Sequence, residues 1–341
     1  MERQELKSSV FSLDAISKFR TQLMGLATLN VMLLHIFQNF ELIYTEALLR
    51  IFESGADVFV LLSGFGLFYS LDKGFSVRPY IKKRLFRIYP EYVLSCLLFG
   101  LLFGIGISGL IQDLLTISFW INASLRYWFI SLIIVLYIIY PIFHRLIKKS
   151  DVFAILIIAA FIAANILLPF IIKDYYWDRC VAFDRIPTFF VGVYLAKKTK
   201  YGKICFESAR VLYFVIIALA SLSLVVYVGG AHYRLVIMPW TIGFTIIVAF
   251  ILEHTKQGNI IVRMISFMGM LSLQIYLFNN HLMEYLRMKL ATLSSNKPVM
   301  ILMSVVLTLL TAYIVKLICD KFRRILVPSD KNSNNRKFSL Q

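Results

Sequence analysis

Lys18 to Phe40 has the sequence KFRTQLMGLATLNVMLLHIFQNF, and Gly55 to Leu71 has the sequence GADVFVLLSGFGLFYSL. A helix needs about 20 mostly apolar residues to cross the hydrocarbon core of a bilayer, and each segment comes close to that length. The first carries one histidine, His35, and the second one carboxylate, Asp57. An ionisable side chain in hydrocarbon costs about 2.5–3.5 kcal/mol, so such groups are retained mainly for function. The two segments therefore predict a pair of membrane helices with His35 as the candidate catalytic residue.

The composition indicates that many more such helices follow. Apolar residues make up 59% of the 341 residues and charged residues only 16%, and the mean hydropathy is +0.76. Ordinary globular domains have about 25% charged residues. Because lipid offers the backbone no hydrogen-bond partner, these segments must be helices, and we expect an all-α polytopic membrane protein, a bundle of about ten transmembrane helices. The predicted spans are 21–39, 56–71, 88–108, 126–147, 152–172, 185–197, 210–228, 233–252, 262–282 and 298–319.

The positions of the basic residues predict the topology. The net charge is +17, but the lysines and arginines lie in short runs between apolar segments, which argues for the bilayer rather than nucleic acid as partner. With ten spans, 27 of the 36 basic residues fall on one side. The more basic side faces the cytoplasm, so both termini are expected there, in a multi-pass protein of the plasma or inner membrane. The expected parts are a cytoplasmic segment 1–20, a transmembrane domain 21–320 and a polar cytoplasmic tail 321–341.

The cysteines predict neither a disulfide framework nor a metal site. There are four of them, far apart and without any C-x-x-C pair or zinc-ligand spacing. We therefore expect no metal cofactor.

His35 and Asp57 are predicted to lie at a similar depth in the outer half of the membrane. His35 is fifteen residues beyond Arg20, which is about 22 Å at 1.5 Å per residue, and Asp57 lies near the start of the returning span. A carboxylate that faces an imidazole fixes its tautomer and raises its basicity, as a general base for a hydroxyl requires. The alternative is that both residues only make hydrogen bonds between helices. Asn39, one turn above His35, could likewise either hydrogen-bond an acceptor or join two helices.

A second candidate site lies in RPYIKKRLFRIYP, residues 78–90, at the cytoplasmic start of the third span. The charges there could simply mark the cytoplasmic side or bind lipid headgroups. Arg84 and Arg87, however, are three residues apart on one helical face and enter the apolar segment, where an unpaired guanidinium is costly. A phosphate-bearing ligand would satisfy them, because arginine binds phosphate oxygens in a bidentate fork.

Six segments resemble, in order, the motifs of the membrane-bound acyltransferase family 3, which O-acylates extracytoplasmic glycans. They are MGLATLNVMLLH, GADVFVLLSGF, KKRLFRIYP, RYWFISLIIVLYIIYP, RIPTFFVGVYLA and LSLQIYLFNNH. The resemblance implies that His35 is essential and that the arginines before I-x-P contact acetyl-CoA. The residues that match this donor site are Arg84 and Arg87, to which we add the neighbouring Lys82 and Lys83.

The same resemblance matches Asp57 and Ser63 to a D-x-F-x-x-x-S-G-F pattern of the family. Ser63 and Gly64 also have a packing explanation, because small residues let helices approach closely. The chain departs from the family pattern at Met24, where members usually have arginine, and Arg20, one turn lower, could replace that residue in the donor site.

Further departures concern the acceptor side. Arg126 and Asn279 occupy positions that members often fill with histidine, and Trp128 follows shortly after Arg126. We assign these three residues and Asn39 to acceptor binding. His281 is expected to point elsewhere. At two further positions, where many members have glutamates, this chain has Ile133 and Ile134.

The combined expectation is an integral-membrane O-acyltransferase. It would move an acetyl group from cytoplasmic acetyl-CoA to a hydroxyl of an extracytoplasmic sugar or polysaccharide. A transporter or flippase of a glycan or small metabolite is the alternative from another class, although no internal repeat relates residues 1–170 to 171–341. An inactive member of the family, motivated by the departures above, is the third possibility.

Overall fold

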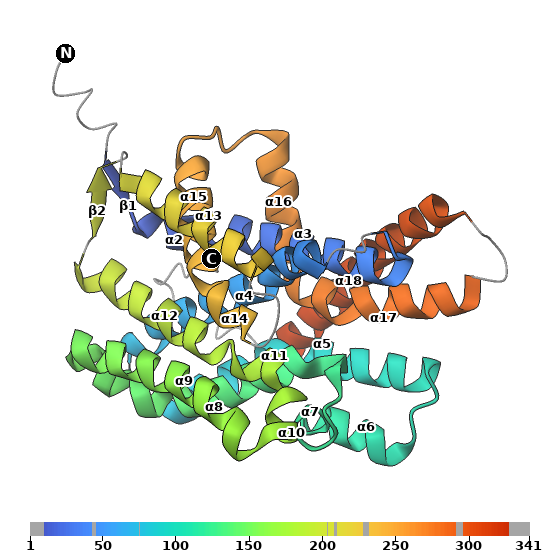
Figure 1. Ribbon diagram of the computed structural model, residues 1–341. Coiled ribbons are helices and arrows are strands. Elements are labelled where there is room, and N and C mark those ends of the chain that lie inside the picture. The colour runs from blue at the N-terminus through green and yellow to red at the C-terminus, as the bar shows by residue number, and fades with distance from the viewer. Residues whose placement is uncertain are drawn as a thin grey trace.

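The computed structural model describes residues 10–42, 46–74, 76–202, 204–207, 210–227, 232–290 and 296–326, and within them the protein is almost entirely helical (Figure 1). The longer helices are α3 (Arg20–Phe40), α4 (Glu46–Asp72), α5 (Val77–Leu102), α8 (Trp128–Lys149), α9 (Asp151–Ile171), α12 (Ile186–Lys197), α13 (Val211–Tyr227), α15 (Met238–Glu253), α16 (Ile260–Met270), α17 (Ser272–Leu290) and α18 (Lys297–Leu326). The shorter ones are α2 (Asp14–Lys18), α6 (Ile107–Leu114), α7 (Ser118–Asn122), α10 (Lys173–Trp177), α11 (Cys180–Phe183) and α14 (Tyr233–Val236).

The predicted class, a helical polytopic membrane protein, is confirmed. Within the described residues, seven helices are long and apolar enough to cross a membrane, or eight if α16 and α17, bent by 76°, form one span. Every predicted span falls on a helix, but α12 has only 12 residues, about 18 Å, against a hydrocarbon core of about 30 Å. The total of ten spans and the cytoplasmic position of both termini remain predictions.

Two pairs of glycines bring the shorter helices against the long ones. A Cβ on Gly64 of α4 would collide with the Phe189 carbonyl of α12, and one on Gly192 of α12 would collide with the Leu61 carbonyl of α4. Small residues allow such backbone-to-backbone packing between membrane helices. The packing role expected for Gly64 is therefore confirmed. In the same way, Gly25 of α3 and Gly269 of α16 meet each other's helix backbones.

The start of the described chain is part of the bundle. Val10–Ser12 (β1) pairs antiparallel with Cys205–Glu207 (β2). The all-helical prediction did not include this small sheet. Phe11 and Ile16 are fully buried, and the Phe11 ring packs edge-on against Phe250 of α15 at 5.5 Å between centroids. The predicted N-terminal segment 1–20 thus contributes residues to the core.

The predicted tail from residue 321 begins as helix. Helix α18 continues to Leu326 and carries Arg323, which donates to both oxygens of the buried Glu91 carboxylate of α5. The rest of the predicted tail, 327–341, and residues 1–9 of the N-terminal segment lie outside the described residues.

Candidate active site

Three arginines from two helices form a basic cluster at the end of the bundle where α3 begins. Arg20 opens α3, and its terminal nitrogen donates to the Leu62 carbonyl of α4 at 3.2 Å, while its Nε is buried without a partner. The charges of Arg87 and Arg84 of α5 both act on the Arg20 guanidinium. The structure therefore brings Arg20 together with the two arginines predicted to bind the donor. We call Arg20, Arg84 and Arg87 the inner arginine cluster.

The inner arginine cluster has no acidic partner. Among the residues that the structure describes, no carboxylate forms an ion pair with any of its three members. The Arg84 Nε is buried without a hydrogen-bond partner, as is the Arg20 Nε. Arginine is always charged, so these groups need an anion or water from elsewhere.

Two tyrosines that the sequence did not single out complete this cluster. Tyr80, one turn before Arg84 on α5, holds its ring 5.9 Å from the Arg84 guanidinium, and its hydroxyl is buried without a partner. Tyr137 of α8 interacts electrostatically with both Arg20 and Arg84. The spacing of Tyr80 and Arg84, i and i+4 on a helix, could have indicated the contact.

Lys82 and Lys83 lie apart from the buried part of this cluster. Both side chains are exposed on α5, and neither forms an ion pair within the described part of the chain. Arg87 is also exposed, and its carbonyl accepts from Arg323 at 3.0 Å. The cluster therefore has a buried part, formed by Arg20 and Arg84, and an open rim.

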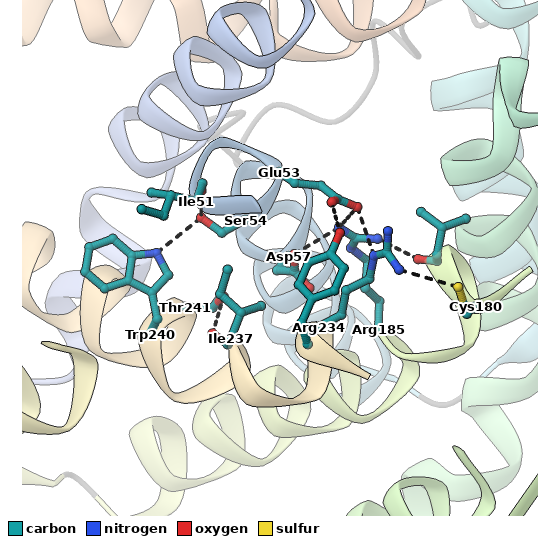
Figure 2. A network of polar contacts seen from close by, with 12 residues as sticks. Ile51, Glu53, Ser54, Asp57, Cys180, Arg185, Arg234, Ile237, Trp240 and Thr241 are labelled. Atoms are coloured by element: carbon teal, nitrogen blue, oxygen red, sulfur yellow. Dashed lines mark hydrogen bonds and ion pairs between the residues drawn. The ribbon is translucent and has the colours of Figure 1, made fainter. Parts of the chain in front are cut away.

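A second polar network lies at the first half of α4 and contains both positive and negative side chains (Figure 2). The Glu53 carboxylate meets Arg185 at 3.1 Å and Arg234 at 2.9 Å, and the Tyr233 hydroxyl donates to its other oxygen. Arg185, at the start of α12, is fully buried and also contacts the Asp57 carboxylate at 3.1 Å. We call Glu53, Asp57, Arg185, Tyr233 and Arg234 the outer network.

The contacts of Asp57 differ from the predicted arrangement. Its ion-pair partner is Arg185, and the described residues show no hydrogen bond or ion pair between Asp57 and His35. The expectation that Asp57 faces the imidazole is therefore not met in the structure. The reason is local: Arg185 lies closer to the carboxylate than any imidazole, and a buried guanidinium must be neutralised.

Trp128 belongs to the same region. The Arg185 guanidinium lies over its indole ring, 4.9 Å from the centroid, and the Arg185 Nε has no hydrogen-bond partner. A guanidinium over an aromatic face is a cation–π contact. Trp128, which was assigned to acceptor binding, thus contacts the outer network directly.

His35 keeps one ring nitrogen free. Its Nδ1 is buried and has no hydrogen-bond partner, while Gln38 interacts with the ring. The charge of Glu53 acts on this imidazole, and His35 in turn acts on His281 of α17. Glu53 and His281, rather than Asp57, are therefore the titratable groups that interact electrostatically with His35.

His281 lies inside the bundle, like Asn279, and contacts other groups than Asn279 does. Its ring is 4.9 Å from that of Phe99 and 5.0 Å from that of Tyr127, and it hydrogen-bonds to the backbone of Arg126. The side chain of Arg126 is engaged by Asp113 at 2.8 Å. His281 thus connects the Arg126 region with His35.

The two predicted asparagines differ in their contacts. Asn39 donates to the His35 carbonyl at 2.9 Å and to the Asn280 side-chain oxygen at 3.1 Å, so it joins α3 to α17. Asn279 is fully buried, and neither its side-chain oxygen nor its nitrogen has a partner. Asn39 thus makes a contact between helices in the structure, and Asn279 has free hydrogen-bonding capacity.

Comparison with known proteins gives one family and one distant relative. The sequence model of the acyltransferase domain family matches residues 23–317. Acyltransferase MdmB of Streptomyces mycarofaciens is 29% identical over 150 residues, which cover 38% of this chain and 39% of that protein. The chain therefore aligns with well under half of that relative. No solved structure matches.

Proposed function

The chain belongs to the acyltransferase family whose domain model covers residues 23–317, and on this premise we propose that it acetylates a sugar hydroxyl across the membrane. The donor would be cytoplasmic acetyl-CoA. The acceptor would be an extracytoplasmic sugar or polysaccharide, and the protein would reside in the plasma or inner membrane. The seven or eight apolar helices among the described residues, together with the family, support a multi-pass membrane acyltransferase.

The observation that carries this proposal is the inner arginine cluster without a carboxylate. Arg20 and Arg84 each keep a buried, unpartnered Nε, and the charges of Arg84 and Arg87 act on Arg20. Coenzyme A carries several phosphates, and a hydrogen bond between charged groups contributes about 1.5–3 kcal/mol. A phosphate in this cluster would relieve the mutual repulsion and satisfy the free donors at once.

The distance along α3 is compatible with a donor that reaches from this cluster to His35. Helix α3 is continuous from Arg20 to Phe40, so the fifteen residues between Arg20 and His35 correspond to about 22 Å. An extended pantetheine arm has a reach of about 15–20 Å by the same reasoning as for a short extended peptide. A donor bound by its phosphates would thus present its thioester near the imidazole.

His35 would serve in one of two ways. As a general base, an imidazole nitrogen takes the proton of the acceptor hydroxyl, the oxygen attacks the thioester carbonyl, and the departing thiolate takes that proton. As a nucleophile, the unprotonated nitrogen attacks the carbonyl and expels the thiolate, which takes the proton of the other ring nitrogen; the hydroxyl then attacks the acetyl-imidazole, and its proton passes to the imidazole as the acetyl group leaves. The free Nδ1 of His35 supports both. Ping-pong kinetics would identify the covalent route.

Proteoliposomes that contain the purified protein test the proposal. With acetyl-CoA labelled in the acetyl group and a polysaccharide acceptor, the wild type should transfer label, and His35→Ala should lose about 100-fold or more of that activity. His254→Ala is the matched control, because His254 is exposed in the connection between α15 and α16 and belongs to neither the inner arginine cluster nor the outer network. Wild-type activity in His35→Ala, or uptake of the acceptor without transfer, would refute the proposal.

A further inference from the structure

A depression of about 470 Å³ lies at the end of α9 that leads into α10, on the face that the topology assigns to the exterior. Neither His35 nor a member of the inner arginine cluster lines it. Its wall contains residues of α9, the start and end of α10, and the residue that precedes α14. These residues are Ile166, Pro169, Phe170, Lys173, Trp177 and His232.

One side of this depression faces lipid. Phe170 is 84% exposed and Ile166 is 51% exposed, and only 11% of the apolar window of α9 is buried in the protein. In a membrane protein such a face contacts acyl chains. A molecule in the depression can therefore extend a hydrocarbon chain along α9 without leaving the bilayer.

The other side is polar and rests on a buried carboxylate. The Tyr176 hydroxyl donates to the Asp184 Oδ1 at 2.6 Å, and the His232 Nδ1 is 3.4 Å from the same oxygen. Asp184 is fully buried, and its Oδ2 has no hydrogen-bond partner. Burial, and then the hydrogen bond to Asp184, raise the pKa of Tyr176 above its usual range, so this hydroxyl remains a donor. The buried Asp184 carboxylate thus lies behind His232, which is the residue of this group that lines the depression.

His232 has a backbone conformation that is uncommon for a residue with a side chain. Its φ is 66°, in the left-handed region, and its ring packs 5.3 Å from the Trp177 indole. Residues in this conformation are uncommon and are found preferentially at functional sites. The conformation places the imidazole against both the indole and Asp184, where it lines the depression.

The depression and the outer network share two stretches of chain. Asp184 supports His232, while the next residue, Arg185, contacts Glu53 and Asp57. His232 lines the depression, while the next two residues, Tyr233 and Arg234, contact Glu53. The charge of Glu53 acts on His35. The depression is therefore joined through neighbouring residues of the chain to the outer network.

We propose that this depression is a docking site for an amphipathic acceptor, one with a hydroxyl-rich headgroup and a hydrocarbon tail. The headgroup packs on Trp177 and donates a hydroxyl toward the His232–Asp184 pair, and the tail lies along Ile166 and Phe170. Binding sites of this kind combine an apolar surface with a few placed polar groups. The inference deepens the proposed function, since it names the acceptor as a lipid-linked sugar rather than a free one.

Photolabelling tests the site without relying on activity. An alkyl glucoside with a diazirine on its chain is added to the protein in phosphatidylcholine nanodiscs and irradiated, and peptides are mapped by mass spectrometry. Label should concentrate on residues 166–177, and excess octyl glucoside should compete, whereas glucose alone and octanol alone should not. Labelling in His35→Ala should equal that of the wild type, so a failed transfer reaction and a failed docking site give different results.

Variants sharpen the experiment. Trp177→Ala and Lys173→Gln should each lower competable labelling at least about threefold, while Phe153→Ala, at the other end of the lipid-facing side of α9, should not change it. Lys173 is exposed, so Lys173→Gln keeps the test valid if Trp177→Ala fails to fold. Label spread evenly along α9, or competition by octanol alone, would show a lipid contact only and overturn the proposal. Competition by glucose alone would also overturn it, because the tail would then have no part in binding.

Discussion

The outer network and the inner arginine cluster contain similar side chains in opposite electrostatic states. In the outer network, Arg185 and Arg234 are matched by the carboxylates of Glu53 and Asp57. In the inner arginine cluster, three guanidiniums have no carboxylate within the described chain, and two of them keep free buried nitrogens. A neutralised arginine has fulfilled its electrostatic requirement within the fold, whereas an unpaired one still requires an anion. The first arrangement stabilises the protein, and the second is suited to bind a ligand.

The comparison has a direct energetic consequence. Removal of one partner from a buried ion pair costs about 3–5 kcal/mol, because the other charge stays behind in the interior. Removal of one cation from a cluster of like charges relieves repulsion instead. Substitutions in the outer network should therefore lower stability, and substitutions in the inner arginine cluster should lower donor affinity.

Glu53→Gln should produce the largest effect. It removes the charge that faces both Arg185 and Arg234, so we expect a loss of about 3–5 kcal/mol and little folded protein in the membrane. Thermal unfolding in detergent, followed by fluorescence-detected size exclusion, measures this. Asp57→Asn should cost less, because Arg185 keeps its second carboxylate. Equal stability of Glu53→Gln and the wild type would contradict the assignment of the outer network to stability.

The combination of Arg84→Ala with Arg87→Ala should have the next largest effect, on binding. Each charge-assisted hydrogen bond to a phosphate contributes about 1.5–3 kcal/mol, so acetyl-CoA affinity should fall at least about tenfold for each arginine. The unfolding temperature without ligand should not fall, since no ion pair is broken. Isothermal titration measures the affinity.

Arg78→Ala is the control for this variant, because Arg78 is exposed on the same helix. Unchanged acetyl-CoA affinity in the double variant would show that these arginines serve only topology. A stability loss as large as that of Glu53→Gln would show that the two clusters do not differ in the way described.

These two regions also show what the sequence could and could not predict. Long apolar segments predicted every major helix, and the I-x-P motif located Arg84 and Arg87. Glu53 was missed because the second span was expected to begin at residue 56, whereas α4 begins at Glu46 and places Glu53 one turn before Asp57. Arg185 was not assigned to a site, although it is the first residue of the predicted span 185–197 and of the segment RIPTFFVGVYLA. Its role became visible when α12 packed against α4, a contact between distant segments.

The bend between α16 and α17 has the same origin. Residues 262–282 were predicted as one span, and hydropathy contains no information on the direction of a helix, so no bend could be predicted. The structure instead turns by 76° between Met270 and Ser272. Gly269 meets the backbone of α3 just before this turn. The structure also places Arg20 within electrostatic range of Arg84 and Arg87. That Arg20 takes the place of the arginine missing at Met24 stays a prediction.

Tyr80→Phe should have a smaller effect, confined to the donor site. The change removes only the buried, unpartnered hydroxyl and keeps the ring that lies near Arg84. If this hydroxyl donates to a phosphate oxygen, the loss of one hydrogen bond, about 0.5–1.5 kcal/mol, should weaken acetyl-CoA binding about two- to tenfold. Without ligand the variant should be at least as stable as the wild type, because an unsatisfied buried group is gone. An unchanged affinity would remove Tyr80 from the donor site.

The smallest effect is expected for Lys82→Ala combined with Lys83→Ala, and it separates the rim of the inner arginine cluster from its buried part. Both side chains are exposed and unpaired within the described chain, so any attraction to a phosphate acts through water. Such attraction contributes less than about 1 kcal/mol and is screened by salt. Acetyl-CoA affinity should therefore fall less than about fivefold at low salt, and the difference should vanish near 0.5 M salt. The part of the arginine double variant's loss that comes from Arg84 should persist at that salt concentration, because its Nε is buried and buried groups are screened much less. A lysine effect that equals the arginine effect at high salt would place the donor phosphates at the exposed surface of α5 rather than among Arg20 and Arg84.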